Sequence, residues 1–397
     1  MPDHNKKRIL LISNGHGEDL LGGVLAQALY QRTQELDILA FPVVGKGDVY
    51  RRFPVEIVGV QKEMPSGGWV RQSFSAVKED IKAGFIKLLR QQWQALRVLR
   101  PRITYTVAVG DIYALYLAFR FCPKPLVFVP TAKSDHIRSH LAIERYLMRK
   151  HCQLVLTRDQ ITATNLSAAS IPAKYVGNLM MDAIFPTGRG FPTLSGRKIV
   201  GILPGSREEA YLNLPLISKM MDIIAAGSPD IGLAVALAGN ISLARTADIL
   251  YEQGWRTADA PTPSAKSDRE MLFIKGSVPL LLAQGRFGDV LEQSSVCVGL
   301  AGTANEQAAG MGKPVVAFPG PGAQYTEKFM LMQKRLLGNA LWTAKAPEDA
   351  GRAVLAILSD PKKHAEMARV GQERMGEPRG SERMADVLLD LWQETGL

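Results

Sequence analysis

The strongest constraint on the fold is an alternation of short, continuously apolar runs with longer helical stretches. Runs such as Ile9–Ile12 and Val315–Phe318 are apolar at every position. A strand covered on both faces has this pattern, and parallel sheets are covered by helices on both faces. We expect strands at residues 8–13, 38–44, 55–60, 103–109, 126–129, 154–157, 198–203, 233–238, 271–274, 296–300 and 315–318. Strands alternating with helices over this length predict an α/β fold with two doubly wound parallel-sheet domains.

Length and composition agree with a globular protein of two domains. The chain has 397 residues, of which 46% are hydrophobic and 22% charged, which excludes a disordered or collagenous chain. No apolar run reaches the ~18 residues of a membrane helix, and the N-terminus lacks the pattern of a secretory signal peptide. We therefore expect a cytoplasmic protein. The cysteines are too scattered for a disulfide framework or a zinc site, and we expect reduced thiols at Cys122, Cys152 and Cys297.

A segment rich in glycine and proline, Pro186–Arg197, marks the expected domain boundary, because a new strand follows it. The sequence thus predicts an N-terminal domain at residues 1–185 and a C-terminal domain at residues 186–380. An amphipathic helix at residues 381–397 is expected to close the fold.

The positive charge is confined to the first half of the chain. Residues 1–180 hold 25 Lys and Arg against 14 Asp and Glu, whereas residues 181–397 hold 23 against 24. Such asymmetry indicates that the first half meets an anionic partner: a nucleic acid, a lipid surface or a phosphorylated substrate. Because this half lacks the aromatic and basic stacking patches of nucleic-acid readers, we expect no nucleic-acid partner.

The stretch Trp69–Arg102 is unusually basic, with eight Lys and Arg against two acids. Within it, apolar residues form one helical stripe, and Ile86 and Val98 fall outside that stripe. The stripe consists of Ile81, Phe85, Leu88, Leu89, Trp93, Leu96 and Leu99. Two interpretations stay open. Either the helix packs its stripe on the core and exposes a solvated basic back, or residues 64–102 contact an anionic membrane surface.

A glycine turn in the second half follows directly after a predicted strand, at Pro204–Arg207. Gly205 and Ser206 can present backbone N–H groups to a phosphate, and Arg207 can clamp it with its planar fork. Ser206 is also expected to cap a helix that starts at Glu208. The alternative is a plain strand-to-helix turn with a surface arginine.

A second turn of this kind lies about a hundred residues further on. Gly302 turns the chain, Thr303 opens a helix, and Glu306 lies one turn into that helix. The Glu306 carboxylate can accept hydrogen bonds from the hydroxyls of a ribose, and a capping role at the helix N-terminus is the alternative. After the next strand, a loop rich in glycine and proline carries Gln324, which can close over a ligand.

In the first half, the sequence NGHGED at residues 14–19 follows the first predicted strand. Glycines let the backbone approach a ligand there, and the next helix offers free N–H groups. It is not the dinucleotide fingerprint, because position 20 is Leu20. Asp111 follows another strand and is our first choice as a general base, with capping of the next helix as the alternative. His16 is the second choice.

These motifs resemble those of GT-B glycosyltransferases, and in particular of the lipid-A-disaccharide synthase family. The resemblance implies a GT-B-like fold, in which the two doubly wound parallel-sheet domains face a central cleft. The LPGSR sequence at 203–207 and the GTANE sequence at 302–306 are similar to that family's strongest signatures. The resemblance runs along most of the chain and includes GEDLLGGVLAQAL at 17–29, AVGDIYALYLAF at 108–119 and AKYVGNLMMDAI at 173–184.

The resemblance implies inverting transfer of a sugar from a nucleotide donor, a UDP-sugar, to a lipid or lipid-linked acceptor at the cytoplasmic membrane face. It implies no metal and no other cofactor. In that family the C-terminal domain holds the nucleotide, with its base near residues 285–287, and the N-terminal domain holds the acceptor. The implied donor-binding residues are Gly205, Ser206, Arg207, Gly302, Thr303, Asn305, Glu306 and Gln324. The implied acceptor-binding residues are Asn14, Gly15, Gly17 and Asp19, of which Asp19 is expected to orient the glycine loop.

Two other functions fit part of this pattern. A nucleotide-sugar epimerase or hydrolase on the same scaffold would need further acid–base residues in the donor cleft and no acceptor surface. A catalytically silent binding module is the other, but a degenerate copy should have lost some of the residues Arg207, Thr303, Glu306 and Gln324, and all of them are present.

Overall fold

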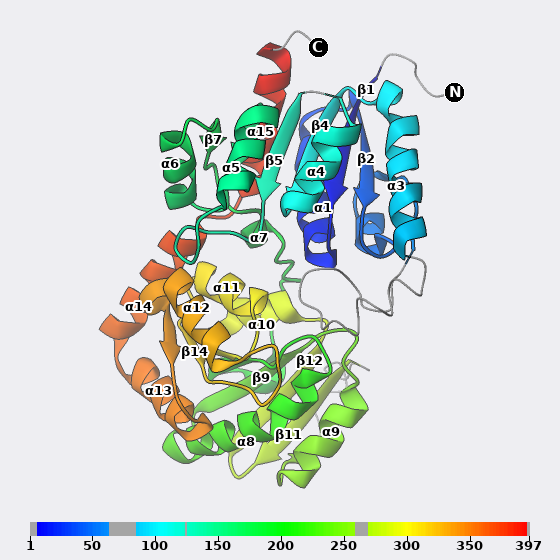
Figure 1. The fold of residues 1–397 in the computed structure, drawn as a ribbon. Helices are drawn as coiled ribbons and strands as arrows, with labels where there is room; N and C mark the ends of the chain where they lie inside the picture. The colour runs from blue at the N-terminus through cyan, green and yellow to red at the C-terminus, as the bar shows by residue number, and fades with distance from the viewer. Residues whose placement is uncertain (1–5, 63–84, 124, 259–268, 395–397) are drawn as a thin grey trace. The chain divides into compact units, whose positions relative to one another are not determined.

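The computed structural model describes residues 6–62, 85–123, 125–258 and 269–394. The chain divides into two compact units (Figure 1). Unit 1 comprises Met1–Ala183 together with Pro378–Leu397, and unit 2 comprises Ile184–Glu377. The final helix α15 (Gly380–Glu394) therefore belongs to unit 1, where Trp392 stacks on Tyr105 at a ring-centroid distance of 4.4 Å.

Unit 1 is built on a parallel sheet of seven strands in the order β3-β2-β1-β4-β5-β6-β7. Its strands are β1 (Lys7–Ser13), β2 (Leu36–Pro42), β3 (Glu56–Ile57), β4 (Tyr105–Gly110), β5 (Leu126–Pro130), β6 (Leu154–Leu156) and β7 (Ala173–Lys174). Its helices are α1 (His16–Arg32), α3 (Phe85–Leu99), α4 (Ile112–Phe121), α5 (Ala142–His151), α6 (Gln160–Ala168) and α7 (Leu179–Asp182), besides α15. Every residue of β4 and β5 is buried, as the continuous apolar runs predict.

One face of this sheet is covered by α3, α4 and α5, whose apolar side chains join those of β1 and β2 in a single core (Figure 1). In α3, Leu88 and Leu96 of the predicted stripe are buried. Ile86 is 52% exposed and Val98 is 69% exposed, so their predicted place outside the stripe is confirmed. The rest of the basic stretch, residues 64–84, lies outside the described residues.

Unit 2 is built on a sheet of eight strands in the order β10-β11-β12-β9-β8-β13-β14-β15. Its strands are β8 (Lys198–Leu203), β9 (Ile231–Leu237), β10 (Arg256–Thr257), β11 (Glu270–Lys275), β12 (Val278–Gln284), β13 (Ser294–Gly299), β14 (Val315–Ala317) and β15 (Leu341–Thr343). Its helices are α8 (Glu209–Gly227), α9 (Leu243–Glu252), α10 (Phe287–Gln293), α11 (Thr303–Gly310), α12 (Glu327–Leu337), α13 (Pro347–Ser359) and α14 (Pro361–Met375).

One edge of the unit 2 sheet departs from the expected parallel pattern. β11 pairs antiparallel with both β10 and β12, whereas the other pairs of this sheet are parallel. The tight turn between β11 and β12 contains Gly276 at a φ of 62°, which only glycine adopts readily. The strand expected at 271–274 is therefore one arm of a hairpin, and its partner β12 is missing from the sequence prediction.

Candidate functional site

The strand order of each sheet reverses once, beside its first strand. In unit 2, β9 pairs on one side of β8 and β13 on the other. In unit 1, β2 and β4 flank β1 in the same way. Open α/β sheets bind ligands at such a point, outside the carboxyl ends of the strands where the chain connections diverge. The turns predicted to bind ligands follow β8 and β13 in unit 2 and β1 and β4 in unit 1.

In unit 2, the turn after β8 needs a glycine. Gly205 has a φ of 105°, in the region that side chains disfavour. Asn213 Nδ2 donates to the Pro204 carbonyl at 3.0 Å, and Asn240 Nδ2 donates to the Ser206 carbonyl at 2.9 Å. Both bonds hold the turn by its carbonyl oxygens and use none of its N–H groups.

The predicted cap of the next helix is wrong. α8 begins at Glu209 with Glu208 in the cap position, and no side chain makes a capping hydrogen bond there. The chain makes one further turn before the helix, in which the Ala210 N–H donates to the Arg207 carbonyl at 2.8 Å. Ser206 and Arg207 are both exposed, so their side chains face solvent instead of the helix end.

The turn after β13 lies beside the first one. A Cβ atom on Gly205 would lie 3.6 Å from the Leu300 carbonyl oxygen. Gly302 is in the cap position of α11, Thr303 is the exposed first residue of that helix, and Glu306 is half-buried in its first turn. The two turns therefore place backbone N–H groups, a hydroxyl and a carboxylate at one edge of the unit 2 sheet.

Asn305 forms hydrogen bonds within unit 2. Its side chain is 0% exposed, and its Nδ2 lies 3.0 Å from each of Gly299 O, Tyr325 Oη and Gln333 Oε1. The side chain is therefore engaged within unit 2, and a nucleotide contact by Asn305 stays a prediction. Asn305 ties the turn after β13 to the loop after β14 and to α12.

The loop after β14 is held by Glu209, which sequence reasoning did not select. Glu209 Oε1 accepts from the Ala323 N–H at 2.9 Å and Oε2 accepts from the Gln324 N–H at 3.1 Å. The Gln324 side chain itself is exposed. Three loops from three adjacent parallel strands, β8, β13 and β14, are therefore joined by hydrogen bonds within unit 2.

The segment expected near the nucleotide base, residues 285–287, follows β12. The Arg286 guanidinium donates to Glu270 at 2.6 Å and to Asp289 at 2.9 Å, and it lies 4.6 Å from the centre of the Phe191 ring. Its charge is therefore committed to the fold of unit 2, while Gly285 beside it is exposed.

In unit 1, the loops after β1 and β4 are joined directly. Asn14 Oδ1 accepts from the Asp111 N–H at 3.2 Å, and a Cβ atom on Gly110 would lie only 1.9 Å from that oxygen. Asp111 is half-buried, and its Oδ1 accepts from the Tyr113 N–H at 2.7 Å, which caps α4. The capping alternative is therefore realised, and a catalytic role for Asp111 stays a prediction.

Asp19 is buried beneath the glycine loop. It is 0% exposed, and Ser13 Oγ donates to its Oδ1 at 2.6 Å, while Tyr50 Oη donates to Ser13 Oγ at 2.9 Å. Burial raises the pKa of Asp19 to about 7, although the hydrogen bond from Ser13 opposes that effect. The network fixes the start of α1 on β1, as the expected role of Asp19 in orienting the glycine loop requires, and its place in an acceptor site stays a prediction.

The remaining residues of this loop differ in exposure. His16 and Gly17 are exposed at the start of α1, and the His16 ring packs against Gly45, where a Cβ atom would lie 2.6 Å from His16 Cε1. Glu18 is half-buried and accepts from Thr131 Oγ1 at 3.3 Å. Sequence reasoning did not select Glu18, because no motif distinguishes it from the other acids of the loop.

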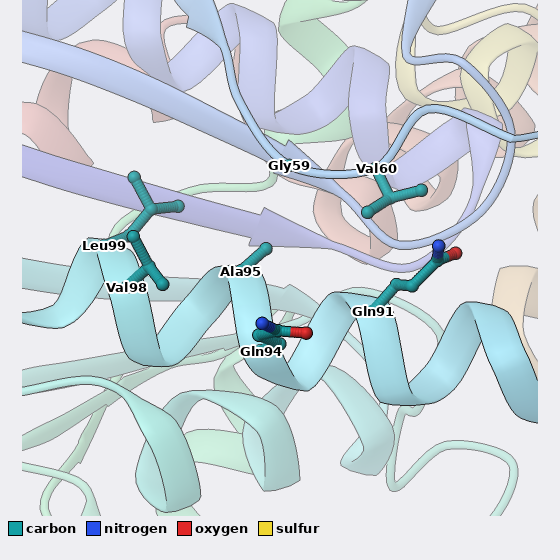
Figure 2. A pocket seen from close by; sticks show the side chains of 7 residues that line it. All are labelled: Gly59, Val60, Gln91, Gln94, Ala95, Val98 and Leu99. Carbon is teal, nitrogen blue, oxygen red and sulfur yellow. The ribbon is translucent and has the colours of Figure 1, made fainter.

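A groove of about 410 Å³ lies between α3 and the segment that follows β3 (Figure 2). It is lined by Gly59, Val60, Gln91, Gln94, Ala95, Val98 and Leu99. The side chains of Val98 and Leu99 give the groove an apolar end, and two glutamines lie on its α3 side. Among the described helices, none combines the length and the apolar character needed to span a bilayer.

Comparison with known proteins shows the fold of the whole chain. No family model matches the sequence, and no curated protein matches it. Solved structures with the GT-B fold do match. The UDP-GlcNAc 2-epimerase from Neisseria meningitidis bound to UDP-GlcNAc has a TM-score of 0.58 at 13% identity, over 98% of this chain and 100% of that one. MurG from Acinetobacter baumannii has a TM-score of 0.58 at 13% identity, over 97% and 99%.

A third solved structure of this fold is CalG4, the calicheamicin glycosyltransferase, with a TM-score of 0.60 at 14% identity, over 98% of each chain. The predicted fold class, two α/β domains with largely parallel sheets, is confirmed.

Proposed function

We propose that this protein is an inverting, metal-independent glycosyltransferase that takes a sugar from a UDP-sugar and transfers it to a lipid or lipid-linked acceptor. The observation that carries the proposal is the group of three loops at the switch point of unit 2. Their N–H groups, the exposed Arg207 and the half-buried Glu306 are what a nucleoside diphosphate requires. Neighbours of the same fold are described as bound to UDP-GlcNAc or as a glycosyltransferase, which supports this choice.

Each loop has a role in holding the donor. Arg207, Gly302 and Thr303 contact the diphosphate, Glu306 accepts from the ribose hydroxyls, and Gln324 contacts the sugar or the phosphates. Charge develops on the departing diphosphate, and fixed N–H dipoles with a guanidinium stabilise that charge without a metal ion. Unit 2, residues 184–377, thus serves as the donor domain and unit 1 as the acceptor domain. The motif resemblance to the lipid-A-disaccharide synthase family supports this division.

A peripheral contact with the cytoplasmic membrane face is part of the proposal. Residues 86–123 and 125–151 carry eleven Lys and Arg against three acids, and none of these acids is exposed. On α3, the exposed apolar side chains of Ile86 and Val98 lie among these cations, and Val98 lines the groove of Figure 2. Each cation near an anionic surface contributes ~1 kcal/mol. This charge pattern favours an acceptor that is a lipid.

The donor site is tested by thermal unfolding with and without nucleoside diphosphates. We expect UDP to raise the melting temperature, because a ligand at a hundred times its Kd stabilises the native state by about 2.7 kcal/mol. Arg207→Ala should reduce this shift, whereas Arg352→Ala, an exposed arginine of α13, should leave it unchanged. If no nucleoside diphosphate stabilises the protein, the donor site is wrongly assigned.

The reaction class is tested with UDP-sugars and a bacterial lipid extract. A transferase releases UDP only when an acceptor is supplied, and mass spectrometry identifies the glycosylated lipid. Conversion of the UDP-sugar without lipid, followed by NMR, would instead identify the nucleotide-sugar epimerase or hydrolase that is our alternative.

A further inference from the structure

The side chain of Glu18 lies at the centre of the carboxyl edge of the unit 1 sheet. Glu18 is the third residue of α1, and its side chain fills space that two glycines leave open. A Cβ atom on Gly15 would lie 2.2 Å from Glu18 Oε2, and one on Gly110 would lie 3.2 Å from Glu18 Cγ. A larger residue at position 15 would therefore displace this carboxylate, whereas at position 110 it would first clash with Asn14 Oδ1 at 1.9 Å.

A hydrogen bond fixes the carboxylate from a third strand. Thr131 follows β5, and its Oγ1 donates to Glu18 Oε1 at 3.3 Å. Because β1, β4 and β5 are neighbours in the sheet, Glu18 lies where the connections of three adjacent parallel strands meet. Its side chain is half-buried, so it is held in place while still reaching the solvent side of the sheet edge.

The two neighbouring carboxylates are committed to the fold. Asp111 Oδ1 accepts from the Tyr113 N–H at 2.7 Å to cap α4, and Asp19 is 0% exposed and bonded to Ser13. A general base needs a carboxylate oxygen that an acceptor hydroxyl can reach. Of the three we choose Glu18, because among the described residues its carboxylate accepts only from the Thr131 hydroxyl at 3.3 Å and its Oε2 lies toward the glycine loop, whereas Asp111 is bound to a backbone N–H at the helix cap.

We propose that Glu18 is the catalytic base of the transfer reaction, which rests on the proposed function. The acceptor hydroxyl oxygen forms a bond to the anomeric carbon of the donor sugar, while the bond from that carbon to the diphosphate oxygen breaks. The electron pair of the broken bond leaves with UDP, and the proton of the hydroxyl moves to a Glu18 carboxylate oxygen. Thr131 keeps the carboxylate in place during this step.

Glu18→Gln tests the assignment, because it keeps the size of the side chain and removes its basicity. UDP release from UDP-GlcNAc, UDP-glucose and UDP-galactose is measured with a bacterial lipid extract. General-base catalysis contributes about 10²–10⁴ in rate, so we expect a loss of that size with an unchanged thermal shift by UDP. Glu35→Gln, an exposed acid beyond the end of α1, should retain the wild-type rate.

Each other outcome is decisive. Wild-type activity in Glu18→Gln overturns the assignment and leaves the proposed function standing. Loss of activity in Asp111→Asn with full activity in Glu18→Gln transfers the role to Asp111. No UDP release by the wild-type protein overturns the proposed transferase itself. Thr131→Val is a second variant in case Glu18→Gln is unstable: it should lower the rate at least several-fold, and an unchanged rate speaks against the base.

Discussion

Replacing Asn305 by alanine should destabilise unit 2 by an amount that can be worked from its contacts. The side-chain amide has two hydrogens for three acceptors at 3.0 Å, so two hydrogen bonds are made at any time. Each buried bond contributes about 1–1.5 kcal/mol. Tyr325 Oη still donates to Gln333 Oε1 at 2.8 Å in the variant, so the Gly299 carbonyl is left as the main orphan. We expect a loss of about 2–3 kcal/mol.

Urea unfolding followed by circular dichroism measures this loss, and a thermal scan should show a fall of roughly 4–12 °C for a unit of this size. Asn339→Ala is the matched control, because Asn339 is an exposed asparagine of the same unit. In a double-mutant cycle with Tyr325→Phe, the two changes should not add, because both side chains bond to Gln333. An Asn305→Ala protein as stable as the Asn339→Ala control would refute the idea that this amide joins the loops after β13 and β14.

Two further predictions concern unit 1. The pKa of Asp19 is about 7 in the fold against 3.8 in the unfolded chain, so the folded state binds the extra proton and its stability falls as pH rises from about 4 to 7. The full fall in the free energy of unfolding is worth about 3–5 kcal/mol, and Asp19→Asn should remove it. If the free energy of unfolding changes by the same amount between pH 5 and pH 8 in both proteins, the prediction is wrong. Val98→Asp should weaken binding to vesicles containing phosphatidylglycerol at least tenfold in a flotation assay, because it adds an acid to the exposed apolar part of α3. Leu212→Asp, at a similarly exposed leucine of unit 2, should not change that binding.

Some features of the site follow from local sequence. The continuously apolar runs predict the central strands of both sheets, because a strand buried on both faces needs apolar side chains at consecutive positions. Gly205 predicts a turn in the same local way, because glycine readily adopts the φ of 105° found there and other residues do not. Arg207, Thr303 and Gln324 are exposed after β8, β13 and β14, where the motifs predict that they face a ligand, and their contact with a nucleotide stays a prediction.

Other features depend on partners that lie far away in the chain. Glu209 binds amides at positions 323 and 324, and Asn305 binds Gln333 on another helix. Neither pairing leaves a pattern in the neighbouring sequence. The sequence therefore could not show that Glu209 and Asn305 hold loops together. The edge hairpin is missed for a similar reason. A strand is expected at 271–274, but its antiparallel pairing and its partner β12 appear only in the fold.

What the sequence determined by itself is therefore the set of elements with local causes: buried strands, glycine turns, and a basic half beside a nearly neutral one. The tertiary structure decided which of several carboxylates near one loop is buried, which caps a helix and which stays accessible. Asp19, Glu18 and Asp111 are all acids that follow strands, and only packing separates them, because burial and hydrogen-bond partners are set by residues from other strands.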